Sequence, residues 1–181
     1  MTILMQRNLT DSKITKSDDI CIDVFIPGYT SEEKALVVKI ELMVLKRLNF
    51  SVSSQGIIAF SLERIFKRNI EIMSSLKKSY EVLKNFEYRL ISTGNNWSVK
   101  DARSAGLPIC IALINVVRKL NGLEQVQSIN GTGILRIDGT FEKSHLEEEK
   151  RKASSELMEN RFINSEVCKN VFNLATLMNG Q

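Results

Sequence analysis

A serine at the entrance to an apolar segment is the first candidate for chemistry in this chain. Ser104 is followed by Ala-Gly-Leu-Pro and then by the apolar stretch 109–117, and Asp101 precedes it by three residues. The pattern predicts that an extended segment becomes a helix at Ser104. Main-chain N–H groups at a helix start have no partner within the helix, and such groups can stabilise an oxyanion. The arrangement favours a nucleophilic serine, and the alternative is a serine that only caps the helix.

The segment around Ser104 resembles the nucleophile motif of the Lon-type proteolytic domain, which runs roughly Pro-Lys-Asp-Gly-Pro-Ser-Ala-Gly. The resemblance implies a peptidase fold with Ser104 as its nucleophile. The residues that match the motif are Lys100, Asp101, Ser104, Ala105 and Gly106, and those that depart from it are Val99, Ala102 and Arg103.

Other parts of the chain follow the order of elements in that family. Apolar and β-branched residues predict strands, and apolar residues spaced by three and four predict amphipathic helices. The similarity is clearest over residues 36–153. In chain order the predicted elements are a strand at 36–44, a long helix at 61–86, a strand at 88–92, the serine helix, a hairpin at 131–141 and a helix at 147–153.

The resemblance also implies a serine–lysine dyad, in which a lysine removes the proton from the serine hydroxyl as it attacks a peptide carbonyl. Counted forward from Ser104 by the family's spacing, the position of the lysine is occupied by Glu147. When the chain is aligned on the hairpin glycines instead, that position is occupied by Glu148. Both registers therefore predict a carboxylate where the family has its lysine. The Gly-Gly pair that precedes this lysine in the family is replaced here by the region Ser144-His145-Leu146.

A carboxylate is poorly suited to the role of this base. An exposed glutamate has an ordinary pKa of about 4.3 and is a weak base at neutral pH, and its negative charge opposes a nearby oxyanion. The candidate replacement bases are Lys143, about a turn before the predicted helix, and Lys150, about a turn inside it. We expect His145, the single histidine, to lie partly exposed in a loop or at a helix start.

Length and composition indicate one globular domain. The chain has 181 residues, of which 43% are hydrophobic and 25% are charged, values that are ordinary for a folded domain with its own core. We expect residues 1–18 to form a polar tail and residues 19–181 to form a single α/β domain in the broad sense, with a mixed sheet and helices packed on it. A terminal helix is predicted at 165–178.

Several classes of function are disfavoured by the sequence. No apolar run approaches the roughly 18 residues of a membrane span. The three cysteines are far apart in the chain, which predicts buried free thiols in a reducing cytoplasm and no metal site. A glycine-rich phosphate loop is missing, so we expect no cofactor, and any ATPase motor would be a separate polypeptide. The net charge of +4 comes from scattered residues without a nucleic-acid motif, so nucleic acid is not an expected partner.

Two functions stay open at this point. In the first, the chain is a degenerate Lon-type domain that acts by binding, either as a subunit of a larger cytoplasmic complex or as a homo-oligomer. In the second, it is an active serine endopeptidase whose lysine is displaced. Glu147 and Glu148 favour the first function, whereas Ser104 and Asp101 favour the second. A further possibility is an unrelated α/β binding domain in which the serine is only a cap.

Overall fold

A computed structural model of the chain describes residues 19–30, 32–46, 49–55, 60–92, 102–157, 159 and 161–180. The predicted tail, residues 1–18, and the predicted site residue Asp101 lie outside the described residues. Among the described residues, no helix has both the length and the apolar character that crossing a bilayer requires.

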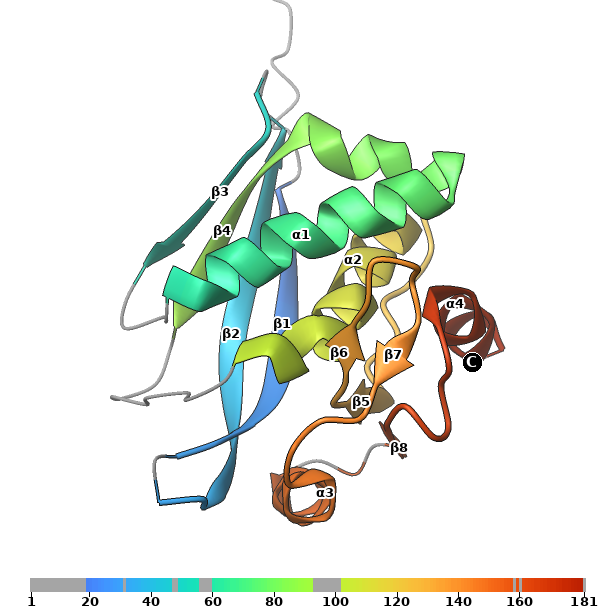
Figure 1. The fold of residues 1–181 in the computed structure, drawn as a ribbon. Coiled ribbons are helices and arrows are strands. Elements are labelled where there is room, and N and C mark those ends of the chain that lie inside the picture. The colour runs from blue at the N-terminus through green and yellow to red at the C-terminus, as the bar shows by residue number, and fades with distance from the viewer. Residues whose placement is uncertain are drawn as a thin grey trace, which may run out of the picture.

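A mixed four-stranded sheet forms one side of the molecule (Figure 1). Its strands are β1 (Ile20–Tyr29), β2 (Ala35–Lys46), β3 (Ser51–Gln55) and β4 (Phe86–Ser92), in the spatial order β1-β2-β4-β3. The β1–β2 and β2–β4 pairs are antiparallel, whereas β3 runs parallel to β4. The predicted mixed sheet is thereby confirmed, and β2 contains the strand that the sequence predicted at 36–44.

One face of this sheet is buried beneath helices. Side chains alternate across a strand, and in β2 Val38, Ile40 and Leu42 are buried while Lys39 points outward. Two helices, α1 (Phe60–Leu76) and α2 (Gly106–Leu120), pack on the buried side (Figure 1). Nearly the whole of α2 is apolar and buried, as its sequence leads one to expect of a central helix.

The long helix predicted at 61–86 is interrupted. The α-helix ends at Leu76, Lys77 is extended, and a 3₁₀ segment, η1 (Lys78–Asn85), leads into β4. Tyr80 and Leu83 remain buried because a 3₁₀ helix places every third residue on the same face. The apolar spacing is compatible with an α-helix followed by a 3₁₀ helix. The prediction of one continuous helix was therefore wrong.

A second group of short strands lies beside α2. β5 (Ile129–Gly131) pairs in parallel with β8 (Arg161–Ile163), and β6 (Ile134–Leu135) forms an antiparallel hairpin with β7 (Phe141–Glu142). The hairpin predicted at 131–141 is confirmed in its central part. Gly131, however, belongs to β5 and pairs with Ile163 of β8.

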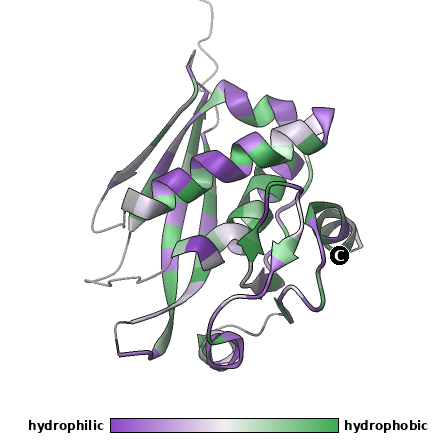
Figure 2. Cartoon of the chain, viewed as in Figure 1, coloured by the Kyte–Doolittle hydropathy of each residue, from purple (hydrophilic) through white to green (hydrophobic). Residues whose placement is uncertain are grey.

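The last two helices differ in character. The helix predicted at 147–153 is present as α3 (Glu147–Leu157), whose residues are mostly hydrophilic (Figure 2). The predicted terminal helix at 165–178 begins later, as α4 (Val171–Asn179). Asn170 fixes that start, because its side chain accepts a hydrogen bond from the Asn173 N–H.

The cysteines are only partly where the sequence predicted them. Cys110 and Cys168 are buried free thiols, and burial raises the pKa of both, that of Cys168 to about 11. Cys21 is exposed, contrary to the prediction, because it lies on the outward-facing side of β1, where alternate side chains leave the core.

We predict that Gly131→Ala destabilises the protein by about 2–3 kcal/mol, since a core site that is already filled responds to added atoms by shifting its backbone. A Cβ atom on Gly131 would lie 2.1 Å from the Ile163 carbonyl oxygen, so β5 and β8 would have to separate. Urea unfolding measures the change. The control is Gly180→Ala, whose Cβ makes its nearest contact at 3.6 Å and should alter stability by less than about 0.5 kcal/mol. Equal stabilities for the two variants would contradict the described packing.

Candidate active site

Ser104 lies in a 3₁₀ turn, η2 (Ala102–Ala105), which leads directly into α2. Ser104 is 4% exposed. The N-cap of α2 is Ala105 rather than Ser104. The serine is therefore at the helix entrance, as its sequence context predicted, but it is not the capping residue that the alternative interpretation required.

The β5–β6 connection holds the serine turn by main-chain hydrogen bonds. The Gly133 N–H donates to the Ser104 carbonyl oxygen at 3.1 Å, and the Leu107 N–H donates to the Gly133 carbonyl oxygen at 3.0 Å. Gly106 brings the two segments into contact, because a Cβ atom there would lie 2.6 Å from the Leu135 nitrogen. The serine turn and the hairpin are thus packed backbone against backbone.

Lys150 is the charged residue buried most deeply in the described part of the chain, with 0% of its surface exposed. It lies on α3, one turn from the start of that helix. Its Nζ donates a hydrogen bond to the Ser144 Oγ at 3.4 Å and lies 5.3 Å from the centre of the Tyr29 ring. Fully buried lysines are rare in proteins and are usually paired or functional.

A chain of hydroxyl groups connects this lysine with the serine turn. The Ser144 Oγ lies 2.9 Å from the Thr132 Oγ1, which donates to the Ser104 carbonyl oxygen at 3.4 Å. A hydroxyl has a single proton to donate, so Thr132 must accept from Ser144, and Ser144 must accept from Lys150. The hydrogen bonds therefore run in one direction, from the Lys150 amine to the Ser104 backbone.

Glu147 stands at the dyad position when residues are counted from Ser104. It is 7% exposed, and both of its carboxylate oxygens accept hydrogen bonds. One accepts from the Ser144 N–H at 2.8 Å, and the other accepts from the Asn164 Nδ2 at 2.9 Å. The bond to the Ser144 N–H spans the turn that leads into α3. Glu147 thus fixes the start of α3 and the position of Ser144.

The other predicted site residues lie at the surface. Glu148 pairs with Arg151 at 2.6 Å. Lys143 lies 3.8 Å from Glu166, and more than two thirds of its side chain is exposed. His145 is more than half exposed in the turn before α3, as the sequence predicted. Of the two candidate lysines, the structure brings Lys150 to the serine turn and leaves Lys143 in solvent.

Three residues of this site were not among the sequence candidates. Thr132 and Ser144 supply the hydroxyl chain, and Asn69 of α1 donates from its Nδ2 to the Gly106 carbonyl oxygen at 2.7 Å. The four-residue pattern from Ser144 to Glu147 is a capping-box signature that could have revealed Ser144. Asn69 is a polar residue on the buried face of an amphipathic helix, which is also a recognisable signal.

No protein-family model matches the chain, and no curated protein is significantly similar to it in sequence. The function must therefore be argued from the geometry of the site.

We predict that Glu147→Ala destabilises the protein by about 2 kcal/mol, because hydrogen bonds to a buried carboxylate are worth more than neutral ones. The loss leaves the Ser144 N–H and the Asn164 amide without their acceptor. Glu148→Ala is the matched control, since an exposed ion pair contributes less than about 1 kcal/mol. Thermal and urea unfolding compare the two variants, and a Glu147→Ala protein as stable as the control would rule out this structural role.

Proposed function

We propose that the protein is a serine peptidase of the Lon type, with Ser104 as its nucleophile and Lys150 as its base. The observation that carries the proposal is the fully buried Lys150, whose Nζ begins a directed chain of hydrogen bonds that ends on the main-chain carbonyl oxygen of Ser104. Burial in general disfavours the charged form of an amine, and enzymes use it to obtain a lysine that can accept a proton.

In the proposed reaction, Lys150 accepts the proton of the Ser104 hydroxyl while the Oγ forms a bond to the carbonyl carbon of a peptide. The resulting tetrahedral oxyanion collapses, the C–N bond breaks, and the leaving amine takes a proton from the Lys150 ammonium. Water then attacks the acyl-serine with Lys150 as base again, which releases the acid and restores the hydroxyl. This sequence follows the general logic of a serine paired with a base.

Ser144 is the positioning residue in this scheme. A neutral lysine amine has two protons and one lone pair, and the lone pair must face the serine hydroxyl. Donation from Lys150 to the Ser144 Oγ restricts rotation of the amine. Because Thr132 and the Glu147 carboxylate fix Ser144 in turn, the amine is held by groups that do not react.

The phase of α3 supports Lys150 over Glu148 as the base. Glu147, Lys150 and Ser154 are the buried residues of this helix, and their spacing of three and four places them on one inward face. Lys150 is three residues beyond the position that spacing from Ser104 gives. Alignment on the hairpin glycines leaves Lys150 two residues beyond the position of the family's lysine, so most of the offset lies between the hairpin and Lys150.

We predict that the purified chain digests casein and that Ser104→Ala and Lys150→Met each lower the rate by at least about a thousandfold, since removing one member of a nucleophile–base unit loses most of its catalysis. Ser144→Ala should lower kcat with little change in KM, because it disturbs the orientation of the base. Cleavage of a fluorogenic casein measures these rates.

The matched control is Lys143→Met, which removes an exposed lysine from the segment before the same helix. This variant should digest casein at the unmodified rate. If the unmodified protein is inactive, the degenerate binding domain becomes the better conclusion. If Lys143→Met abolishes activity and Lys150→Met does not, the base has been assigned to the wrong lysine.

A further inference from the structure

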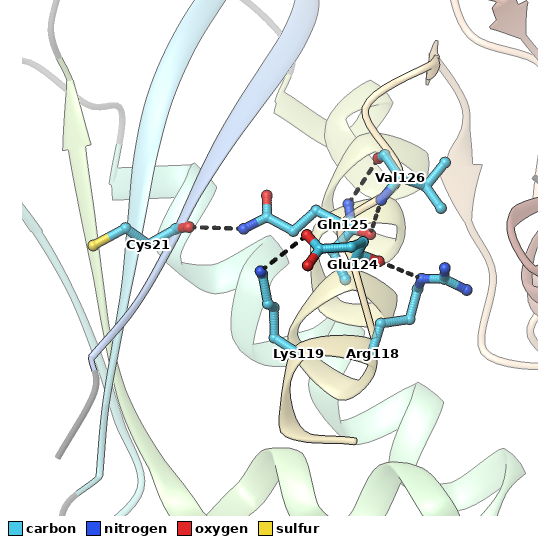
Figure 3. Close-up of polar contacts among 7 residues, drawn as sticks. Cys21, Arg118, Lys119, Glu124, Gln125 and Val126 are labelled. Carbon is cyan, nitrogen blue, oxygen red and sulfur yellow. Dashed lines mark hydrogen bonds and ion pairs between the residues drawn. The ribbon is translucent and has the colours of Figure 1, made fainter. Parts of the chain in front are cut away.

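Among the strands that the structure describes, none covers one edge of β1, because β1 is the first strand in the order β1-β2-β4-β3. Two observations show which of its main-chain groups face outward. Gln125 donates from its Nε2 to the Cys21 carbonyl oxygen at 3.1 Å, from the side away from β2 (Figure 3). Pro27 has no N–H and cannot donate toward β2.

Outward and inward main-chain groups alternate along an antiparallel strand with a period of two residues. Asp23 and Phe25 lie between Cys21 and Pro27 at the same period of two residues. Their N–H and C=O groups therefore also face the uncovered edge. Among the hydrogen bonds between described residues, none occupies these four groups. An uncovered edge of this kind can pair with a further strand.

A cavity of about 300 Å³ lies beside this edge. Asp23, Val24 and Phe25 form one wall, and the first three turns of α2 contribute an apolar surface through Pro108, Ile111 and Ala112. The cavity thus combines main-chain hydrogen-bonding groups with an apolar surface, which are the two requirements for binding an extended peptide.

The cavity lies near the proposed catalytic site, although neither Ser104 nor Lys150 is among its described lining residues. Pro108 lies one helical turn beyond Ser104, and Asn130 of β5 lines the cavity two residues before Thr132. At the other end of β1, Tyr29 lies against Lys150. A chain bound along β1 would therefore run toward the serine turn.

The charged residues among the described lining are Asp23 and Glu159, and both are acidic although the chain has a net charge of +4. The side chain of Asp23 is about half exposed and pairs with Lys39 at 2.7 Å. Glu159 is exposed at the cavity rim. Positive charge on a ligand would be attracted here and negative charge repelled.

We infer that this cavity binds an extended polypeptide segment as an additional strand on β1 and selects segments with a basic side chain. The inference rests on the proposed function, since the bound segment is the substrate chain. Its main chain pairs with Asp23 and Phe25, and alternate side chains point toward the α2 surface. A lysine or arginine at one of the intervening positions, whose side chains share the outward face of the sheet with Asp23, is attracted by the carboxylates of Asp23 and Glu159.

Two fluorescein-labelled peptides of about ten residues test this inference, because that length spans about 33 Å when extended. One alternates threonine and lysine, and the other alternates threonine and glutamate. Fluorescence anisotropy measures their binding to the full chain with Ser104→Ala, which prevents cleavage. We expect the lysine peptide to bind at least about fivefold more tightly, and equal binding of the two peptides would overturn the inference.

The variants Asp23→Asn and Glu159→Gln should each weaken binding of the lysine peptide by about two- to fivefold, which is the contribution of an exposed ion pair. Glu156→Gln is the matched control, since Glu156 is an exposed acid on α3 that does not line the cavity. It should leave binding unchanged. An effect of Glu156→Gln equal to that of Glu159→Gln would show attraction by overall charge and contradict a specific cavity.

Phe25→Pro tests the strand pairing, because it removes an outward-facing N–H from an edge strand, where proline is tolerated. Phe25→Ala keeps that N–H and controls for loss of the ring, which lines the cavity. In Phe25→Pro, binding of the lysine peptide should fall by at least about fivefold, and urea unfolding verifies that the variant is folded. Retained binding would contradict pairing with β1. The charge variants test the cavity independently should this variant unfold.

These results also separate the inference from the proposed catalysis. Tight binding of the lysine peptide without digestion of casein would support the cavity and contradict the catalytic proposal. Digestion of casein without preference between the peptides would support the catalysis and overturn the cavity.

Discussion

The burial of the Lys150 amine is the constraint on which the rest of the site depends. A lysine removed from solvent must find hydrogen-bond acceptors, because an unsatisfied buried charge costs several kcal/mol. Here the acceptor is the Ser144 hydroxyl, which comes from the turn just before the lysine's own helix. Ser144 can serve only because Thr132 accepts its proton and Glu147 binds its N–H. The burial of one side chain thus determines the roles of three others.

This network also explains why segments far apart in the chain converge. The serine turn and the β5–β6 connection share main-chain hydrogen bonds, and that connection carries Thr132. On the opposite side of the turn, Asn69 links α1 to Gly106. Ser104, Lys150 and the hydroxyls of Thr132 and Ser144 are therefore carried by elements that are packed and hydrogen-bonded independently of any reaction. Catalysis by preorganised groups requires a scaffold of this kind.

The sequence predicted the regular parts of the fold better than the site. The alternation in β2 and the apolar run of α2 specify a strand and a central helix locally, and both formed as expected. The break at Lys77 was missed because a three-residue repeat suits α and 3₁₀ helices alike. The late start of α4 depends on the Asn170 cap, which apolar periodicity does not detect.

The candidate site was only partly accessible to sequence reasoning. Ser104 and both lysines were identified from residue type and neighbourhood. Counting residues placed a carboxylate opposite the serine in both registers, because Lys150 lies two or three residues beyond the counted positions. The choice between Lys143 and Lys150 depends on which face of α3 is buried, and the hydroxyl chain depends on contact between Thr132 in the β5–β6 connection and Ser144 before α3. Neither can be deduced from local sequence.

The central claim is that Ser104 is activated by Lys150, and the most direct test is the site of covalent modification by a serine-directed acylating probe. Intact and peptide mass spectrometry locate the acyl group in the unmodified protein and in Lys150→Met. The account predicts a single modification on Ser104 that is absent from Lys150→Met. Modification on Ser144 instead, or equal modification of Ser104 in both proteins, would contradict it.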